Sequence, residues 1–155
     1  MTTRHGFSTT RIVLAQGRDG ERQEYMRRWI LSTPWFTVRL HKIMLSDKGP
    51  PHNHPWKFVS VILKGEYVEE LFHPFKVTSF GQVTLGNPLP LRRKAFKPVY
   101  RSRTQFHRVL VKEPVWTLCL TSGAMLHNGS ARWGFMTHDG YVPWQQFDPD
   151  ATEEL

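Results

Sequence analysis

A single cysteine, Cys119, stands among the 155 residues, so no disulfide bond can form within the chain. Long apolar runs are also missing. None approaches the roughly 20 residues that span a bilayer, and no charged segment followed by an apolar one opens the sequence. We therefore expect a soluble, cytoplasmic protein without membrane contact. The length and the 39% hydrophobic content predict one domain over residues 1–155, with its core at about 35–147 and loose ends at 1–9 and 148–155.

Acidic residues are missing from one long stretch, because no Asp or Glu lies between Glu70 and Glu113, although the chain carries a net charge of +8. The basic residues of this stretch are Lys76, Arg92, Arg93, Lys94, Lys97, Arg101, Arg103, Arg108 and Lys112. They predict a positive surface beside a site for an anionic substrate, a face that contacts nucleic acid, or a solvated basic face. Nucleic acid is the less favoured partner, since no repeat of aromatic residues interleaves with the basic ones.

The local patterns predict an all-β protein with one short helix near its N-terminus. Apolar residues at helical spacing, together with the stop at Thr33-Pro34, predict that helix over Glu21–Leu31. A short strand, Thr10 to Gln16, precedes it. Beyond the helix, short runs rich in Val, Ile, Leu, Phe and Thr alternate with Gly and Pro, as in antiparallel sandwiches and barrels. The predicted strands are Phe36–Leu45, Phe58–Leu63, Tyr67–Phe72, Gln82–Leu85, Pro98–Tyr100, Phe106–Val111, Val115–Thr121, Trp133–Met136 and Tyr141–Phe147, with a tight hairpin at Lys64-Gly65.

Two histidines separated by one residue, His52 and His54, carry the clearest chemical signal. Side chains two apart on an extended segment project to the same side, about 7 Å apart, so both imidazoles can converge on one ion. His107 lies in a later predicted strand that one barrel can bring to the same point. The three histidines are therefore the predicted ligands of one divalent metal ion.

At these positions the sequence resembles the cupin superfamily, whose fold is a double-stranded β-helix, or jelly-roll barrel. Its first motif runs Gly, a gap, His-x-His, a few residues, Glu, a gap and Gly, and its second motif centres on one His. The matching residues are Gly49, His52, His54, Gly65 and His107. Where the first motif has Glu, this chain has Phe58 and Val59. The resemblance therefore implies a three-His site.

Among three-His cupins, the thiol dioxygenases are the most similar, over roughly residues 28 to 122. The resemblance covers the stretch from His52 through Gly65 to Phe72 and the segment around His107. Arg28 is the nearest positional match to the arginine that holds the substrate carboxylate in that family. The family's Ser-x-His-x-Tyr triad falls on Thr117, Cys119 and Thr121, so it is not kept.

Three neutral ligands leave a divalent ion its full charge and open positions, where an anionic substrate and O₂ can bind side by side. The resemblance favours Fe(II) as the metal. Zn, Mn and Ni are the alternatives, and Zn in such a site activates a bound water instead.

Further site residues follow from strand parity and position. Tyr67 and Glu69 share a face after the hairpin, where either is a candidate catalytic acid or base or a substitute ligand, or Glu69 is simply solvated. Arg39 and His41 bind the anion if their face of the strand is the barrel interior, and lie in solvent if it is not. The remaining candidate substrate-binding residues are Arg28, Trp56 and Arg101.

The leading hypothesis is thus a non-haem Fe(II) oxygenase-like enzyme that acts on a small anionic substrate. The first alternative is a non-catalytic cupin module that binds a ligand or nucleic acid through the basic stretch. The second is a metal-free sugar isomerase or epimerase of the cupin type, which leaves the three histidines unexplained. By analogy with other barrels, we expect a homodimer.

Overall fold

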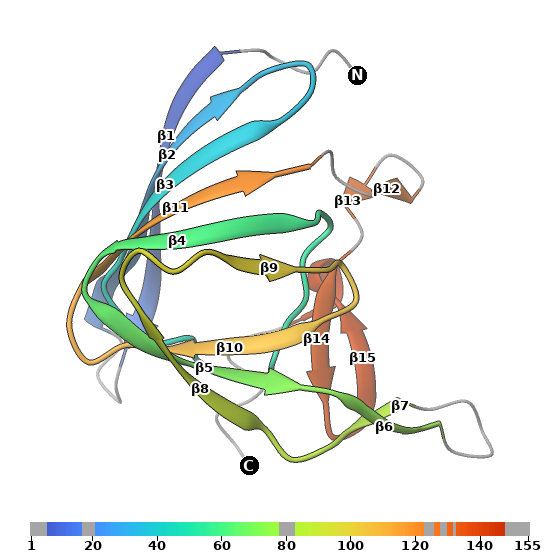
Figure 1. Cartoon of the computed structure of the whole chain (residues 1–155). Helices are drawn as coiled ribbons and strands as arrows, with labels where there is room; N and C mark the ends of the chain where they lie inside the picture. Colours follow the sequence, from blue (N-terminus) through green and yellow to red (C-terminus); the bar gives the residue numbers. More distant parts are fainter. Residues whose placement is uncertain are drawn as a thin grey trace.

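The computed structural model describes residues 6–16, 21–77, 83–122, 126–127, 130–131 and 133–147. Over these residues the chain consists of strands and one short 3-10 helix, η1 (Trp144–Gln146), as Figure 1 shows. The strands up to residue 94 are β1 (Gly6–Gln16), β2 (Glu21–Ser32), β3 (Thr37–Ile43), β4 (Phe58–Lys64), β5 (Glu66–Phe72), β6 (Pro74–Val77), β7 (Val83–Leu85) and β8 (Leu89–Lys94). The later strands are β9 (Val99–Arg101), β10 (Phe106–Leu110), β11 (Val115–Thr121), β12 (Leu126–His127), β13 (Ser130–Ala131), β14 (Gly134–Thr137) and β15 (Gly140–Pro143). In this described part of the chain, no helix has the length and apolar character needed to cross a membrane.

The largest sheet has the strand order β1-β2-β3-β11-β4-β9, and all its pairs are antiparallel. Its side chains alternate between two faces. In β11, Thr117, Cys119 and Thr121 are buried, whereas Leu118 and Leu120 are exposed. One face of this sheet therefore lines the interior, and the other faces outward.

A three-stranded sheet, ordered β10-β5-β8, closes the other side of the interior, with the β14–β15 hairpin beside it (Figure 1). The link between them is His52, which forms an antiparallel bridge to His107 of β10 and another to Phe135 of β14. The segment before β4 thus runs between two strands, and its histidines are brought to the barrel interior.

The apolar core is split into two small clusters. One joins both sheets through Ile62, Tyr67, Val109 and Val115, and the other contains Phe72, Phe106 and Met136. The interior also buries polar residues, namely Ser60, Glu69, Arg101, His107, Thr117 and Thr121. Because buried polar groups need partners, this interior requires a defined network of hydrogen bonds, and the candidate site lies there.

The predicted helix over Glu21–Leu31 is wrong, because this segment is strand β2, paired with β1 on one side and β3 on the other. The physical reason is that β2 carries apolar residues on both faces. Trp29 and Leu31 lie on one face of β2, opposite Leu40 and Val38 of β3, and Ile30 lies on the other face. In a strand that is apolar on both faces, apolar and polar residues do not alternate along the sequence. The apolar residues can then fall at the three- and four-residue spacing that is typical of a helix.

Most other predicted strands are confirmed with small shifts at their ends, and the hairpin turns at Gly65, whose φ is +88°. The predicted strand Tyr141–Phe147 is wrong in its second half, because β15 ends at Pro143 and Trp144–Gln146 form η1. The sequence did not predict β6, β8, β12 or β13. The expected loose segment at 1–9 is also wrong in part, because β1 begins at Gly6. Residues 1–5 and 148–155 lie outside the described residues.

Replacing Gly65 by Ala should lower the free energy of unfolding by about 1–2 kcal/mol, because a positive φ brings the Cβ of other residues into conflict with the backbone. The added Cβ would also lie 3.2 Å from Cγ2 of Val115. Urea unfolding measures the change. The neighbouring Lys64→Ala variant, which alters an exposed side chain, should change the free energy by no more than about 0.5 kcal/mol.

Candidate metal centre

His52 and His54 are positioned by backbone pairing and not by their side chains. His52 N–H donates to the carbonyl of His107 at 3.0 Å, and the N–H of His107 donates back at 2.9 Å. Asn53 N–H donates to the carbonyl of Gly134 at 3.1 Å, and its side-chain oxygen accepts from Gly134 N–H at 2.8 Å. The peptide that carries both histidines is thus fixed to β10 and β14, so both rings point to the interior.

The three imidazoles converge as predicted. Their ring centroids lie 5.0 Å apart for His52 and His107, and 5.1 Å apart for each of the other two pairs. One ring nitrogen from each lies within 4.8 Å of the others, and in the described part of the chain these three histidines form the group that could hold a metal ion.

The donor set fits a metal ion. The Nε2 atoms of His54 and His107 are 2.9 Å apart, and two nitrogens bound about 2.1 Å from one ion at 90–109° are roughly 3.0–3.4 Å apart. Burial lowers the pKa of His52 to about 4 and that of His54 well below its usual value. Both rings are therefore neutral near pH 7, which is the form that binds a metal.

Among the residues that the structure describes, no carboxylate joins the three histidines in place of the Glu of the first motif. Phe58 occupies that region, with its ring edge-to-face against His54 at 5.1 Å between centroids. Trp56 stacks on the other side of His54 at 5.9 Å. The aromatic rings shield His54 from water and leave the ion's remaining positions without a protein ligand among the described residues.

Glu69 supports the centre from behind His107. Its carboxylate accepts a hydrogen bond from Nδ1 of His107 at 2.9 Å, and its side chain is 2% exposed. This contact places the proton of His107 on Nδ1 and leaves the Nε2 lone pair directed at the ion. Burial on its own would raise the pKa of Glu69, but hydrogen bonds from His107 and Arg101 outweigh it and lower the pKa to about 2. The alternative of a solvated Glu69 is therefore wrong.

Two arginines neutralise this buried carboxylate. Arg101 donates through Nε to Glu69 at 2.7 Å and through a second nitrogen, and Arg93 donates at 2.8 Å. The Arg101 side chain is 7% exposed and also bonds the carbonyl of Tyr100. Arg101 was predicted to bind the substrate, but in the structure its guanidinium donates hydrogen bonds to Glu69 and to the carbonyl of Tyr100. No role was predicted for Arg93. The pairing of Arg93 in β8 with Tyr67 in β5, on the same face as Glu69, would have been needed to predict its contact with Glu69.

A cationic group, formed by Arg28 and Arg39 with the neutral His41 beside them, lies on the inner face of the six-stranded sheet. Arg39 and His41 of β3 pair with Cys119 and Thr117, which are buried, so the interior alternative for this face is the correct one. Arg28 lies beside them, paired with His41. Burial, followed by the charge of Arg28, lowers the pKa of Arg39 to about 10.

The polar atoms of this group are only partly satisfied. Arg28 donates to Thr10, and Arg39 donates to Thr121 and lies over the ring of Trp56 at 4.1 Å. Neither arginine has a carboxylate partner among the described residues. His41 contacts Cys119 at 3.8 Å through Nδ1, while its buried Nε2 has no partner. Because buried polar atoms rarely stay unpaired, this nitrogen is a candidate contact for a polar ligand atom.

Tyr67 is buried in the apolar cluster beneath the centre, on the same face of β5 as Glu69, as predicted. Burial, and then the charges of Glu69 and Cys119, raise its pKa. Its hydroxyl is therefore protonated at every physiological pH, so Tyr67 can donate a proton but cannot serve as a base.

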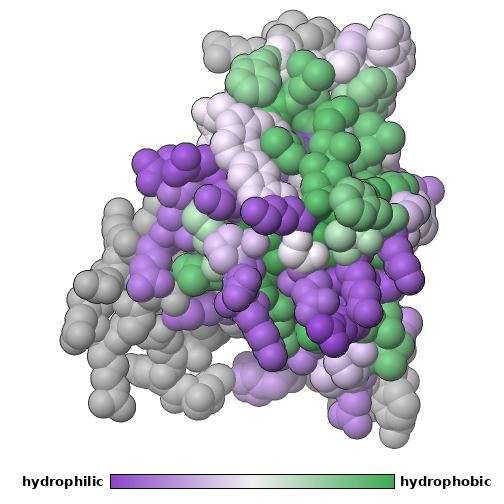
Figure 2. All heavy atoms as spheres, turned by 60° about the vertical axis from the view of Figure 1, so that its left-hand side comes forward, coloured by the Kyte–Doolittle hydropathy of each residue, from purple (hydrophilic) through white to green (hydrophobic). Residues whose placement is uncertain are grey.

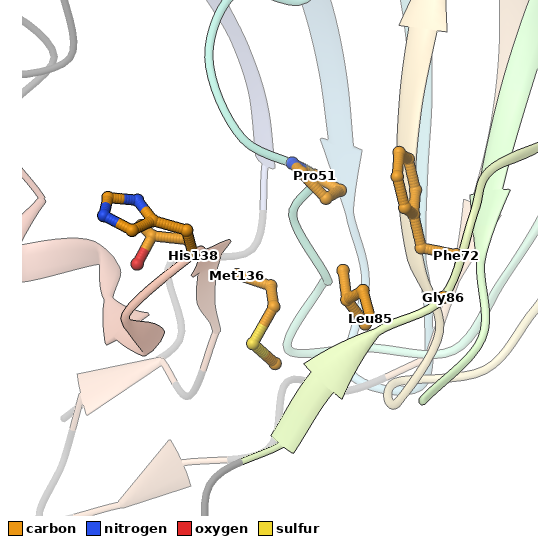
Figure 3. A pocket seen from close by; sticks show the side chains of 7 residues that line it. Pro51, Phe72, Leu85, Gly86, Met136 and His138 are labelled. Carbon is orange, nitrogen blue, oxygen red and sulfur yellow. The ribbon is translucent and has the colours of Figure 1, made fainter. Parts of the chain in front are cut away.

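A separate cleft of about 250 Å³ lies near the β14–β15 hairpin (Figure 3), and His52, His54 and His107 are not among its lining residues. Its lining residues are Pro51, Phe72, Leu85, Gly86, Met136, Thr137 and His138. Phe72 and Met136 belong to the second apolar cluster, and the one titratable group, His138, is exposed and pairs with Asp139 at 3.1 Å. The chemistry of the molecule is thus concentrated at the histidines and not in this cleft.

No protein-family model matches the chain, and no curated protein matches it. Solved structures do match. A cupin 2 conserved barrel domain protein from Rhodopseudomonas palustris superposes with a TM-score of 0.56 at 14% identity, covering 87% of this chain and 81% of that one. A cupin-2 domain protein from Rhodospirillum rubrum gives 0.53 at 12% identity, with 84% and 78% covered. This chain has the cupin fold, as the sequence predicted.

Two enzymes superpose less well. The chain spans about half the length of each. A DMSP lyase gives a TM-score of 0.48 at 16% identity, with 65% of this chain and 49% of that one covered. The hydroxypropylphosphonic acid epoxidase from S. wedmorenis gives 0.47 at 10% identity, with 72% and 55% covered. At this similarity neither activity transfers to the present chain.

The Glu69→Gln variant should bind Co²⁺ or Zn²⁺ about 10–100-fold more weakly, because an amide neither fixes the His107 proton as firmly nor neutralises Arg101 and Arg93. Competition with a chromophoric chelator measures the affinity. Glu70→Gln is the matched control, since the adjacent Glu70 pairs with Arg108 instead, and it should stay within about twofold of wild type. Equal losses in both variants would show that Glu69 acts only on the fold.

The metal-free protein should lose stability as the pH falls below 6.5, in part through His41. Burial, with the charges of Arg28 and Arg39, lowers the pKa of His41 from 6.5 to about 3. Below pH 6.5 the unfolded chain therefore binds a proton that the folded chain does not, so the free energy of unfolding declines. His41→Asn should reduce that slope by up to about 1.4 kcal/mol per pH unit in urea titrations, whereas His73→Asn, at an exposed histidine, should leave it unchanged.

Proposed function

We propose that this chain is a metal-dependent enzyme that uses Fe(II) and O₂ to oxygenate a small anionic substrate. The observation that carries the proposal is the meeting of two groups in one interior: three imidazoles with converging nitrogens, and the cationic group of Arg28 and Arg39 with the neutral His41 beside it. Trp56 links them, because its ring stacks on His54 at 5.9 Å between centroids and lies under the guanidinium of Arg39 at 4.1 Å.

The cationic group favours an anion. Arg28 and Arg39 have no carboxylate partner among the described residues, and the pKa of Arg39 is lowered first by burial and then by the charge of Arg28. A carboxylate or similar anion placed between them relieves the repulsion between the two charges and forms charge-assisted hydrogen bonds. The orphan Nε2 of His41 supplies a further polar contact, and the face of Trp56 borders the same space. Arg28, Arg39, His41 and Trp56 are therefore the proposed substrate-binding residues.

Three neutral ligands suit Fe(II), and imidazole also suits Zn and Ni. When bound, Fe(II) would supply open positions for O₂ and for an anionic substrate atom. The protein's own groups hold that arrangement: Glu69 fixes the proton of His107, and Phe58 and Trp56 exclude water from His54. Glu69 acts as a positioning residue, since three donors occupy its ionised carboxylate. Tyr67 remains a candidate proton donor.

Small thiols that carry a carboxylate are the first substrates to test, because the sequence resembles the thiol dioxygenases at the metal ligands. In that reaction a thiolate and O₂ give a sulfinate, R–S⁻ + O₂ → R–SO₂⁻. Both oxygen atoms end on sulfur, so no external reductant is needed.

The nucleic-acid alternative is not proposed. Arg92, Arg93, Arg101 and Arg108 of the basic stretch form ion pairs with Glu66, Glu69 and Glu70 of β5. Much of the charge that would attract phosphates is thereby compensated within the protein.

Purified protein should contain about one transition-metal ion per chain, and a His52→Ala/His107→Ala variant should contain almost none. Elemental analysis measures the content. A folded wild type that stays empty after anaerobic addition of Fe(II) would overturn the metal site itself. Metal without oxygen uptake on any anionic substrate would overturn the oxygenase and leave a ligand-binding protein.

Arg39→Gln should raise the KM for an anionic substrate about 10–100-fold in oxygen-electrode assays, because a buried charge-assisted contact is lost. Its metal content should be unchanged. Arg108→Gln is the control, since Arg108 pairs with Glu70 and the carbonyl of Gly49, away from the cationic group. Unchanged KM in Arg39→Gln would remove Arg39 from the substrate site.

A further inference from the structure

Two stacked tryptophans lie beside the candidate metal centre and lead from it to solvent. The ring of Trp133 meets His52 edge-to-face, with 6.4 Å between the ring centroids. Trp144 stacks on Trp133 at 5.7 Å, with 10° between the two ring planes, and its side chain is 41% exposed. A candidate metal ligand, a half-buried indole and an exposed indole are therefore in consecutive ring contact. The proposed function leaves this tryptophan pair without a role.

The backbone holds the pair against the segment that carries the histidines. Trp144 N–H donates to the carbonyl of Trp133 at 3.1 Å. The next residue, Gly134, accepts a hydrogen bond from the N–H of Asn53 at 3.1 Å and donates its own N–H to the side-chain oxygen of Asn53 at 2.8 Å. Because Asn53 directly follows His52, this pairing keeps Trp133 beside the candidate metal ligand.

The charges around the rings favour Trp133 over Trp56 as the indole that loses an electron. An oxidised indole is a radical cation, so a cation over its ring opposes the oxidation. Trp56 stacks on His54, but the guanidinium of Arg39 lies over Trp56 at 4.1 Å. Among the described residues, no cation lies over Trp133, and stacking on Trp144 lets two rings share the positive charge.

We propose that Trp133 and Trp144 form an electron relay that protects the metal centre when an oxidant is generated there without a substrate. The inference rests on the proposed function in one respect, because it needs a ferrous centre that meets O₂. Trp133 gives one electron to the centre, and Trp144 gives one electron to Trp133. Electron transfer between rings in contact is fast, since electronic coupling falls off exponentially with distance. The ring of His52 is thereby spared from oxidation.

The relay needs a reductant in solution, and small thiols supply it. Each thiol returns one electron to the exposed ring of Trp144 and releases one proton, and two thiols oxidised in this way join as a disulfide. The complete reaction is O₂ + 4 RSH → 2 H₂O + 2 RSSR, in which oxygen is reduced and sulfur is oxidised. No bond in either indole forms or breaks, so the pair is restored after each electron.

Mass-spectrometric peptide mapping of the iron-loaded wild type tests the relay. Hydrogen peroxide supplies the oxidant, and thiol and substrate are left out, so that oxidised rings are trapped as hydroxylated or ring-opened products. Trp144 should carry at least about tenfold more oxidation than Trp35, because an oxidant held within the protein reacts ahead of one that must diffuse. Exposure alone favours the opposite order, since Trp35, in the turn between β2 and β3, is 81% exposed and Trp144 is 41% exposed.

A second stacked pair in the same molecule is the matched control. Trp29 and Trp116 stack at 5.5 Å, with 13° between their planes. They lie on the outward face of the six-stranded sheet, where hydrophobic side chains form one continuous area (Figure 2). The ring contacts of the three histidines in the described part of the chain do not include this pair. Trp116 should therefore stay largely unmodified under the same treatment.

Two variants test protection directly, with elemental analysis of the iron that remains after peroxide treatment in the presence of glutathione. Trp144→Phe should lose iron several-fold faster than wild type, and its oxidation should move to Trp133 and His52. Trp116→Phe should keep its iron as the wild type does.

Labelling of the wild type that follows exposure, or equal iron retention in Trp144→Phe and Trp116→Phe, would overturn the relay. Oxygen uptake on anionic substrates is measured separately. Preferential labelling of Trp144 in protein that oxygenates none of them would support the relay and overturn the oxygenase, whereas an active oxygenase with unlabelled Trp144 would overturn the relay alone. Protein that takes up no iron would overturn both.

Discussion

The carboxylate of Glu69, buried between the two sheets, is the group on which the interior depends. It binds His107 of β10, Arg93 of β8 and Arg101 of β9, and thereby joins strands of both sheets at one point. A buried ion pair rarely adds stability over well-packed apolar residues, but removing one partner leaves uncompensated buried charge. The network therefore specifies one arrangement of the strands, and that arrangement sets the direction of the His107 ring.

A polar interior explains the divided core. Besides two apolar clusters, the interior buries Ser60, Thr117 and Thr121 together with charged residues. Hydrophobic burial alone does not hold such an interior together, and hydrogen bonds accepted by the side chains of Glu69, Asn53 and Asp47 also connect the segments. Asp47 accepts from Tyr25 and from the N–H of Val109, so it ties the entrance of the histidine segment to β2 and β10. Part of the barrel interior is thus occupied by polar residues of the candidate site and not by apolar core residues.

The sequence predicted the parts of the fold and site that are encoded locally. The His-x-His spacing and the alternating strands were enough to bring His52, His54 and His107 together, because an extended chain fixes which side chains share a face. The β1–β2 hairpin was missed because the outward face of its sheet is apolar, so β2 has no period of two. Local patterns assume that solvent covers one side of a strand and that this side is polar, and the outward side of β2 carries Trp29 and Leu31 instead.

The role of Glu69 could not be predicted for a different reason. Arg101 is 32 residues away in sequence and Arg93 is 24. The pairing of β5 with β8 brings Arg93 near Glu69, whereas Arg101 reaches it from β9 of the other sheet. Arg101 was expected to bind an anionic substrate because its charge can be read from the sequence. Its ion pair with Glu69 could not be read from the sequence. The same argument applies to His41: parity left two faces open to it, and the strand pairing of β3 with β11 decided for the interior.

Anomalous X-ray diffraction from crystals grown anaerobically with Fe(II), recorded on both sides of the iron absorption edge, tests the central claim most directly. The account predicts one strong peak per chain, about 2.0–2.2 Å from a ring nitrogen of each of His52, His54 and His107, with Glu69 still bonded to Nδ1 of His107. A peak at another group, or none in fully reduced and loaded crystals, would contradict it.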